Sequence, residues 1–568
     1  MRTQALLFAC CLIVARPDRA AGARAPGSPG LLVDDGPSLE RLEQSGYAFT
    51  DVVSRAKRAA LHATIAADMD EFTRDLGPES VRRSFSIAWL TRGRFELVGV
   101  VNRFDRRFDP PEPPSCGEVR LIYRLALQNP GRPATRLPMT VNVRVPQPPA
   151  PDCAAVAARW RSTSDVLGIL RDLPAFTHLE TNFQSVHVPS YRVDMDDNAE
   201  YVLRSFAVAG DSLVPDVLTN TPRPDLNPSE IAALAEWVTE HGDAIAAGTA
   251  MVPARFLAQR SVSVSPRGLL HLANRPFSRL FPDPQGTFAG VSRTTPELLL
   301  RRLDESTCAG CHQSRGVAGF HLLGEERDRT RTFNALAVGH SPHLAAELPW
   351  RAEVLAAAAR GEGPRRPRPF SGRADGPGAA GAECGLAPGF AAWTCAPGLV
   401  CRDHQRGPLG VCASAEGGRP GDPCEGVTTT PSARPEGMIV TSDPPDARCP
   451  AVTEENMARA FCAPNWLGFT GGMCSARCAR VGAMEGGAIC APLPTAGYEA
   501  DCFTTREPVE RCLRRHLLNA KIATCDADHA CRDDYACTRV PGAPEGVGAC
   551  VPPYFVFQAR VDGPALDR

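Results

Sequence analysis

The chain of 568 residues contains no run of about 18 uninterrupted apolar residues, the length that a membrane-spanning helix needs. Its net charge is only −2 at pH 7 with neutral histidines, so there is no electrostatic case for a nucleic acid or an anionic membrane as a partner. Lysine is nearly absent, since Lys57 and Lys521 are the two lysines among 62 basic residues. P-loop, GxSxG, HExxH and EF-hand patterns are also missing, which removes the commonest signatures of nucleotide, hydrolase, zinc-protease and calcium sites.

Residues 1–23 have the pattern of a secretory signal peptide. Arg2 supplies a positive charge, residues 5–15 are apolar, and Ala21-Gly22-Ala23 is a small-residue cleavage site. We therefore expect an exported protein, located in the periplasm, secreted or at the cell surface. Its mature chain is expected to contain no integral membrane segment.

Cysteines are distributed unevenly along the chain. Residues 31–360 contain four of the 22 cysteines, whereas residues 384–550 contain sixteen. Between these regions, residues 361–383 are rich in Pro, Gly and Arg and show no periodicity, which indicates a linker. In an exported protein, the cysteine density of residues 384–550 predicts small disulfide-bonded modules, whose connectivity the sequence does not reveal.

We predict that residues 31–290 form an α+β domain. Three β-rich runs indicate neighbouring antiparallel strands, at residues 94–104, 118–127 and 139–145. One helix is predicted over residues 227–248, with Asn227 as N-cap and Glu230 at the capping-box position. Cys116 and Cys153 flank the strand pair and can form a disulfide with each other.

Residues 291–360 contain the motif with the clearest chemistry, Cys308-x-x-Cys311-His312. Thr295 as cap and Pro296 after it predict a helix over residues 294–307 that runs directly into this motif. Covalent haem attachment needs two thiols one helical turn apart and a histidine directly after the second thiol to bind the iron. The TCAGCH stretch meets this requirement and resembles the attachment site of c-type cytochromes. The resemblance implies a helical, cytochrome c-like segment that carries haem c.

Three longer stretches are similar to large exported bacterial proteins that contain a cytochrome-like CxxCH. They are VVNRFDRR at residues 100–107, PSEIAALAEWV at residues 228–238 and DESTCAGCH at residues 304–312. This similarity implies export and does not imply a particular reaction.

A second iron ligand is not evident in the sequence. No methionine lies between His312 and the linker, so the methionine ligand of a small c-type cytochrome has no counterpart there. His321, His340 and His343 are the available nitrogen ligands, and His321 is the first choice because it is nearest. A haem would then have two histidine ligands or be open on one side.

Two other interpretations of the motif remain open. Cys308 and Cys311 can be a disulfide or a free dithiol, as in many CxxC pairs. They can also bind a metal ion, with zinc as the first candidate and His312 or His321 as further ligands. A second pair of zinc ligands is not evident.

The leading expectation is an exported haem c-binding protein that serves in electron transfer or haem-based sensing, with an unknown redox partner. The competing class is a secreted or cell-surface cysteine-rich binding or structural protein that has no haem, an oxidised CxxC and an unknown surface ligand. A third is a peroxidase-like enzyme, which would need an open distal haem face and a base that the sequence does not identify.

Overall fold

The computed structural model describes residues 30–415 with internal gaps, followed by short pieces of the cysteine-rich region. The gaps are residues 76–82, 86, 109–114, 128–134, 150–152, 164, 188–198, 266–271, 292–293, 318, 325–338, 374 and 404–406. The further pieces are residues 423, 460–463, 473–476, 524–526, 531–533, 535–539 and 547–551. The predicted signal peptide and much of the cysteine-rich region therefore lie outside the described residues.

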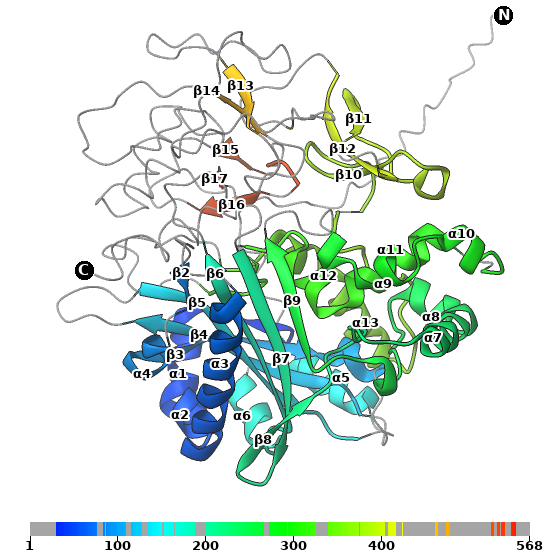
Figure 1. Cartoon of the computed structure of the whole chain (residues 1–568). Helices are drawn as coiled ribbons and strands as arrows, with labels where there is room; N and C mark the ends of the chain where they lie inside the picture. The colour runs from blue at the N-terminus through cyan, green and yellow to red at the C-terminus, as the bar shows by residue number, and fades with distance from the viewer. Residues whose placement is uncertain are drawn as a thin grey trace, which may run out of the picture.

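An antiparallel sheet of nine strands forms the centre of the first region (Figure 1). Its main path runs β1-β3-β4-β5-β6-β7-β8, while β2 pairs with β6 and β9 pairs with β7. The strands are β1 (Leu32–Val33), β2 (Arg83–Ser84), β3 (Gly93–Arg103), β4 (Glu118–Leu127), β5 (Thr135–Pro146), β6 (His178–His187), β7 (Ala199–Ala209), β8 (Ser212–Asp216) and β9 (Arg260–Ser265). The three strands predicted from the sequence are confirmed as β3, β4 and β5, which are antiparallel neighbours.

Helices and short helical turns surround this sheet, with α1 to α4 on one side of the view in Figure 1 and α7 to α13 on the other. The α-helices are α1 (Gly36–Leu42), α2 (Phe49–Val52), α3 (Arg55–Asp75), α4 (Ala88–Arg92), α5 (Cys153–Ser162), α6 (Val166–Arg171), α7 (Pro228–Glu240), α8 (Gly242–Ala247), α9 (Pro276–Leu280), α10 (Pro284–Thr287), α11 (Pro296–Ser306), α12 (Cys308–Gln313) and α13 (Pro342–Ala358). The turns are the π-helical η1 (Glu43–Tyr47) and the 3₁₀ turns η2 (Phe104–Phe108), η3 (Ala254–Phe256), η5 (Leu272–Asn274) and η6 (Pro388–Phe390). No helix among the described residues is both long enough and apolar enough to cross a membrane.

The helix predicted over residues 227–248 is present but divided. Its capping box is confirmed, because Asn227 accepts a hydrogen bond from the Glu230 N–H and the Glu230 side chain accepts one from the Asn227 N–H. His241 ends α7 with φ −103° and ψ 17°, and α8 begins at Gly242. The break lets Ile245 of α8 join Leu234 of α7 in a second core cluster with α9 and α11.

The predicted disulfide between Cys116 and Cys153 is confirmed. It links the residues before β4 to the first residue of α5, across a sequence separation of 37 residues. Cys116 is completely buried, so the bond also fixes α5 against the main hydrophobic core.

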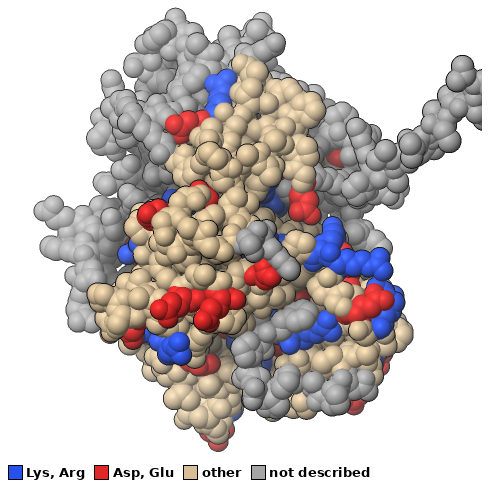
Figure 2. Space-filling model, turned by 90° about the vertical axis from the view of Figure 1, so that its right-hand side faces the viewer, with Lys and Arg blue, Asp and Glu red and all other residues tan. Residues whose placement is uncertain are grey.

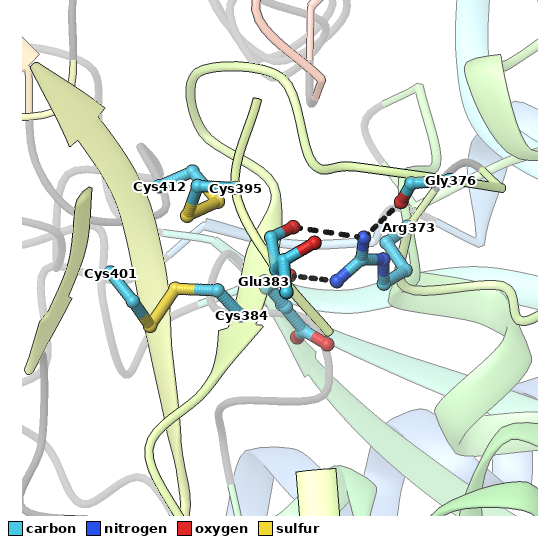
Figure 3. Close-up of a disulfide and its surroundings, with 8 residues drawn as sticks. Arg373, Gly376, Glu383, Cys384, Cys395, Cys401 and Cys412 are labelled. Atoms are coloured by element: carbon cyan, nitrogen blue, oxygen red, sulfur yellow. Dashed lines mark hydrogen bonds between the residues drawn. A yellow bond between two sulfur atoms is a disulfide. The ribbon is translucent and has the colours of Figure 1, made fainter. Parts of the chain in front are cut away.

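Described parts of the C-terminal region form small sheets, and disulfides hold the sheets β10-β12-β11 and β15-β17-β16. The strands are β10 (Glu383–Gly385), β11 (Leu399–Asp403), β12 (Leu409–Ser414), β13 (Ala460–Ala463), β14 (Met473–Ala476), β15 (Thr524–Cys525), β16 (Ala536–Arg539) and β17 (Gly548–Val551). In the first module, the bonds Cys384–Cys401 and Cys395–Cys412 hold the three-stranded sheet β10-β12-β11 together (Figure 3). A later module contains Cys525–Cys537.

The first module and the predicted linker both contact α11. Arg301 of α11 forms a buried ion pair with Glu383, and Thr295 donates a hydrogen bond to the Gly389 carbonyl at 2.9 Å. Within residues 361–383, the Ser371 N–H donates to Glu305 of α11 at 2.9 Å. Arg373 in turn donates to the carbonyls of Glu383 and Gly376, as Figure 3 shows. The boundary in cysteine content is therefore bridged by polar contacts.

The two faces of the central sheet differ in chemistry. Alternate residues on β4 and β5, such as Leu121 and Val141, are almost fully buried in the main core. The opposite face carries a network in which Glu118 pairs with Arg120 at 2.7 Å and with Arg144 at 2.6 Å. Glu180 pairs with Arg120 at 2.8 Å. These charges are largely buried, in contrast to the exposed surface in Figure 2, where acidic and basic side chains are both present.

We predict that Glu118→Gln lowers the free energy of unfolding at pH 7 by roughly 3–5 kcal/mol, because it removes one of the two carboxylates that neutralise the buried Arg120 and Arg144 and leaves Glu180 to serve both. Burial opposes ionisation of Glu118, but Arg144, Arg120 and Arg106 outweigh it and hold its pKa well below the ordinary value. The stabilisation is therefore complete above the unfolded-state pKa of about 4.3. It disappears as the pH falls through the folded-state pKa.

Urea unfolding followed by circular dichroism at pH 7 and at acid pH measures this effect. Glu236→Gln on the exposed face of α7 is the matched control and should unfold like the wild type. Equal stability of Glu118→Gln and wild type at pH 7 would contradict the prediction.

Candidate functional site

The CxxCH motif forms its own short helix. The predicted helix before it is confirmed as α11, with Thr295 accepting a hydrogen bond from the Leu298 N–H at 3.3 Å. It does not run directly into the motif, because Thr307 is extended, with φ −74° and ψ 155°. The Thr307 hydroxyl then accepts from the Gly310 N–H at 3.0 Å and starts α12.

Close packing enforces this break in the helix. A Cβ atom at Gly310 would lie 2.1 Å from the Asp304 carbonyl oxygen, so only glycine fits at that point of the motif. The Asp304 side chain is completely buried and accepts a hydrogen bond from the Phe277 N–H at 2.8 Å. Burial raises the pKa of Asp304 to about 6. These contacts fix the direction in which α12 leaves α11.

A cavity of about 260 Å³ lies between the charged face of the sheet, α11, α12 and α13. All four residues singled out in the sequence line it, namely Cys308, Cys311, His312 and His321. His343 of α13 lines it as well. The fold therefore gathers the predicted site residues around one space, although their side chains have different partners.

Cys308 faces an apolar and backbone environment. Its sulfur lies 3.7 Å from the Thr219 carbonyl oxygen, and its side chain packs beside Leu203 and Leu218. Burial raises the pKa of the Cys308 thiol to about 12. Cys308 and Cys311 are the free cysteines of the described part of the chain.

Cys311 faces two histidines. Its sulfur lies 3.6 Å from Nε2 of His321, and the rings of His321 and His343 are 4.5 Å apart between centroids. One ligand atom from each of Cys311, His321 and His343 lies within 4.8 Å of the others. Burial opposes ionisation of Cys311, but the charges and hydrogen bonds of the two histidines hold its pKa well below the ordinary thiol value.

The N-terminus of α13 positions both histidines. Ser341 is the N-cap of α13 and accepts a hydrogen bond from the Leu344 N–H at 3.1 Å. The same hydroxyl lies 2.9 Å from Nδ1 of His321, which leaves Nε2 of that ring directed toward Cys311. His343 lies in the first turn of α13, and Nε2 of His343 is 4.0 Å from the carboxylate of Glu347 one turn later.

His312 points into the core instead. Its Nδ1 is 2.8 Å from the Ser263 hydroxyl on β9, and its ring contacts Tyr201 and Phe320 at centroid distances of 4.8 and 5.7 Å. Burial, together with the charge of His321, holds the pKa of His312 well below its ordinary value. Its contacts place His312 outside the Cys311–His321–His343 cluster.

This arrangement does not fit a haem group as it stands. Thioether links to both sulfurs with His312 on the iron require the three groups to face one macrocycle. Here the sulfurs of Cys308 and Cys311 contact different partners, and the His312 ring is enclosed by Tyr201 and Phe320. Haem attachment would require these side chains to reorient.

A single metal ion fits the cluster of Cys311, His321 and His343 better. Tetrahedral zinc bonds of about 2.0–2.3 Å place ligand atoms roughly 3.5 Å apart, close to the 3.6 Å between Cys311 and His321. His321 Nε2 also lies 2.7 Å from the Cys311 carbonyl oxygen, so a metal ion would replace that hydrogen bond. Ser341 and Glu347 supply the outer polar partners that metal-binding histidines commonly have.

Sequence reasoning found Cys311 and His321 but treated His343 only as one of three available histidines. The available signal was a helix start at Ser341-Pro342 followed by the spacing His343-x-x-x-Glu347. This spacing puts the histidine and the carboxylate on one face of the helix. His340 is elsewhere, 3.8 Å from Asp34.

A comparison of the chain with protein-family models, curated proteins and solved structures finds no match.

We predict that Cys311 is alkylated faster than Cys308 in reduced, metal-free protein at pH 7. Both thiols are partly buried, so the difference in thiolate fraction decides their rates. Iodoacetamide labelling followed by peptide mass spectrometry measures each site. Cys308→Ala should leave the fast labelling intact and Cys311→Ala should remove it; equal labelling of both thiols would contradict the prediction.

Proposed function

We propose that the chain is an exported metalloprotein in which Cys311, His321 and His343 bind a transition metal ion, with zinc as the first candidate. The observation that carries the proposal is the convergence of these three ligand atoms within 4.8 Å at the wall of a cavity. Three protein ligands with a fourth position open to a cavity are typical of catalytic zinc sites. A zinc ion in such a site acts as a Lewis acid and lowers the pKa of a bound water molecule.

The state of the cysteines supports this proposal. Disulfides join cysteines in both regions of the described chain, which favours an oxidising compartment and, with the N-terminal pattern, export. Cys308 and Cys311 nevertheless remain thiols. A thiolate bound to a metal ion is protected from disulfide formation, so a metal on Cys311 accounts for a reduced CxxC in such a compartment.

We expect the purified full-length chain to bind one equivalent of Zn²⁺ with an affinity that depends on Cys311, His321 and His343. Loss of an outer partner typically weakens metal binding about 10–100-fold, so Ser341→Ala should weaken it by that factor and Cys311→Ser or His343→Ala by more. Metal analysis and competition with a chromophoric chelator measure this.

Cys308→Ala is the matched control for the metal site, because Cys308 lies in the same motif but contacts Thr219, Leu203 and Leu218. It should bind zinc like the wild type. Unchanged zinc affinity in Cys311→Ser, or no zinc uptake by the wild type, would refute the proposed metal site.

The second candidate function is haem c binding for electron transfer or sensing, as the TCAGCH stretch implies. It is favoured by the fact that Cys308, Cys311 and His312 line the same cavity, with His321 as the nearest further nitrogen ligand. In this candidate, both thiols are consumed in thioether links and the metal site at Cys311 does not form.

Expression in a host with cytochrome c maturation machinery separates the two candidates. Covalent haem gives a Soret band that survives acid-acetone extraction and that changes in Cys308→Ala, which lacks one thioether. The metal proposal expects no such band and unchanged zinc binding in Cys308→Ala. A protein with the extraction-resistant band and no zinc would reverse the order of the candidates.

A further inference from the structure

Arginines outnumber carboxylates where the cavity meets α13. Arg302, Arg351 and Arg368 all line the cavity that Cys311, His321 and His343 also line. The carboxylate nearest to two of them is Glu347, which pairs with Arg351 through one oxygen and with Arg368 through the other. The same carboxylate faces His343 at 4.0 Å. One negative charge therefore serves two arginines and the histidine that we assign to the metal.

The neighbouring acids are already engaged. Asp105 forms a two-point pair with Arg103, at 3.0 and 2.8 Å, and lies 4.0 Å from Arg351. Glu305 pairs with Arg301 at 3.1 Å and accepts the Ser371 N–H at 2.9 Å. Neither acid is available to neutralise a further arginine at hydrogen-bond distance.

Arg302 is the least compensated of these cations. It is 5 % exposed, and its closest acid, Glu305, is 3.9 Å away. One nitrogen donates to the Pro369 carbonyl at 3.0 Å, and the guanidinium lies over the Phe370 ring at 3.7 Å. Its Nε makes no hydrogen bond to any residue that the structure describes. A buried cation without a close counterion is costly unless a ligand supplies the negative charge.

We infer that this cavity binds an oxyanion, a phosphate or carboxylate group of a substrate, between Arg302 and the metal ion of the proposed function. The inference rests on the proposed function for one of its two anchors. Arginine presents a planar fork of donors that matches the oxygens of phosphate and carboxylate. A divalent metal bound through a single thiolate adds a further positive charge to the same cavity, which increases its preference for an anion.

The burial of Arg302 agrees with this assignment. Burial lowers the pKa of Arg302 to about 10, because Glu305, with Glu347 and Asp375, offsets only part of the cost of a buried charge and Arg368 adds to that cost. The sheet wall of the cavity presents the neutral amides Asn142 and Asn182 beside Arg120 and Glu180, which form an ion pair at 2.8 Å. The site therefore combines one cation that needs a partner, one proposed metal position and amides that can bind the remaining oxygens.

The test uses the full-length chain loaded with Co²⁺, whose visible spectrum reports changes in its ligands. Sodium phosphate and sodium acetate are titrated separately, with sodium chloride at matched ionic strength as reference. We expect saturable spectral changes with at least one of the two anions and a rise in the thermal midpoint. Stronger binding of phosphate identifies a tetrahedral oxyanion as the ligand group, and stronger binding of acetate identifies a carboxylate.

Arg302→Gln should lower the affinity for the anion about ten- to hundredfold, which is the loss expected for a charge-assisted hydrogen bond. Arg302→Lys retains the positive charge without the planar fork of donors, so it should lose less of the affinity for the anion. It is the test variant to use if Arg302→Gln does not fold. Arg279→Gln, exposed on α9, is the matched control and should bind like the wild type.

The outcomes separate the two proposals. Co²⁺ uptake without a saturable response to either anion overturns the oxyanion site and leaves the metal site intact. The same holds if Arg302→Gln and Arg302→Lys bind the anion as tightly as the wild type does. Failure to take up Co²⁺ or Zn²⁺ overturns the proposed function, and the oxyanion site between metal and Arg302 falls with it.

Discussion

The pairing of arginines with carboxylates in the interior is the interaction on which the rest of this structure depends. The central sheet is covered on both faces, and one face is apolar whereas the other combines buried charges with a smaller apolar cluster around Val101 and Leu322. On the other face, Glu118 and Glu180 hold Arg120 and Arg144 in one network. Because buried charges are tolerated only when they are paired, this network decides which elements can pack on that face and how closely they approach.

Buried ion pairs also connect segments that are distant in the chain. Glu347 of α13 holds Arg368 of residues 361–383, and Arg301 of α11 holds Glu383 at the start of the first disulfide module. Helices α11 and α13, which lie before and after the CxxCH in sequence, are thus joined by ion pairs to the connecting stretch and the first module. A cavity remains where α11, α12 and α13 meet the sheet.

Local patterns were enough for much of the fold. β-rich runs predicted β3, β4 and β5, caps predicted the starts of α7 and α11, and flanking positions suggested Cys116–Cys153. Each of these depends on neighbours in sequence or on one strand pair. The breaks at His241 and Thr307 were not predicted, because packing against distant residues decides them. At Thr307, the next residue makes such a contact, since the Cys308 N–H donates a hydrogen bond to the hydroxyl of the distant Thr221 at 2.9 Å.

The sequence by itself determined the type of chemistry, two thiols and several histidines near α11, and the division of the chain by cysteine content. Only the tertiary structure decided which of these side chains meet. His312 follows Cys311 directly, yet the turn of α12 directs it into the core beside Ser263 and Tyr201. His343, 32 positions after Cys311 in the sequence, reaches Cys311 because the N-terminus of α13 packs there. Adjacent residues on a helix point in different directions, whereas packing brings distant residues together.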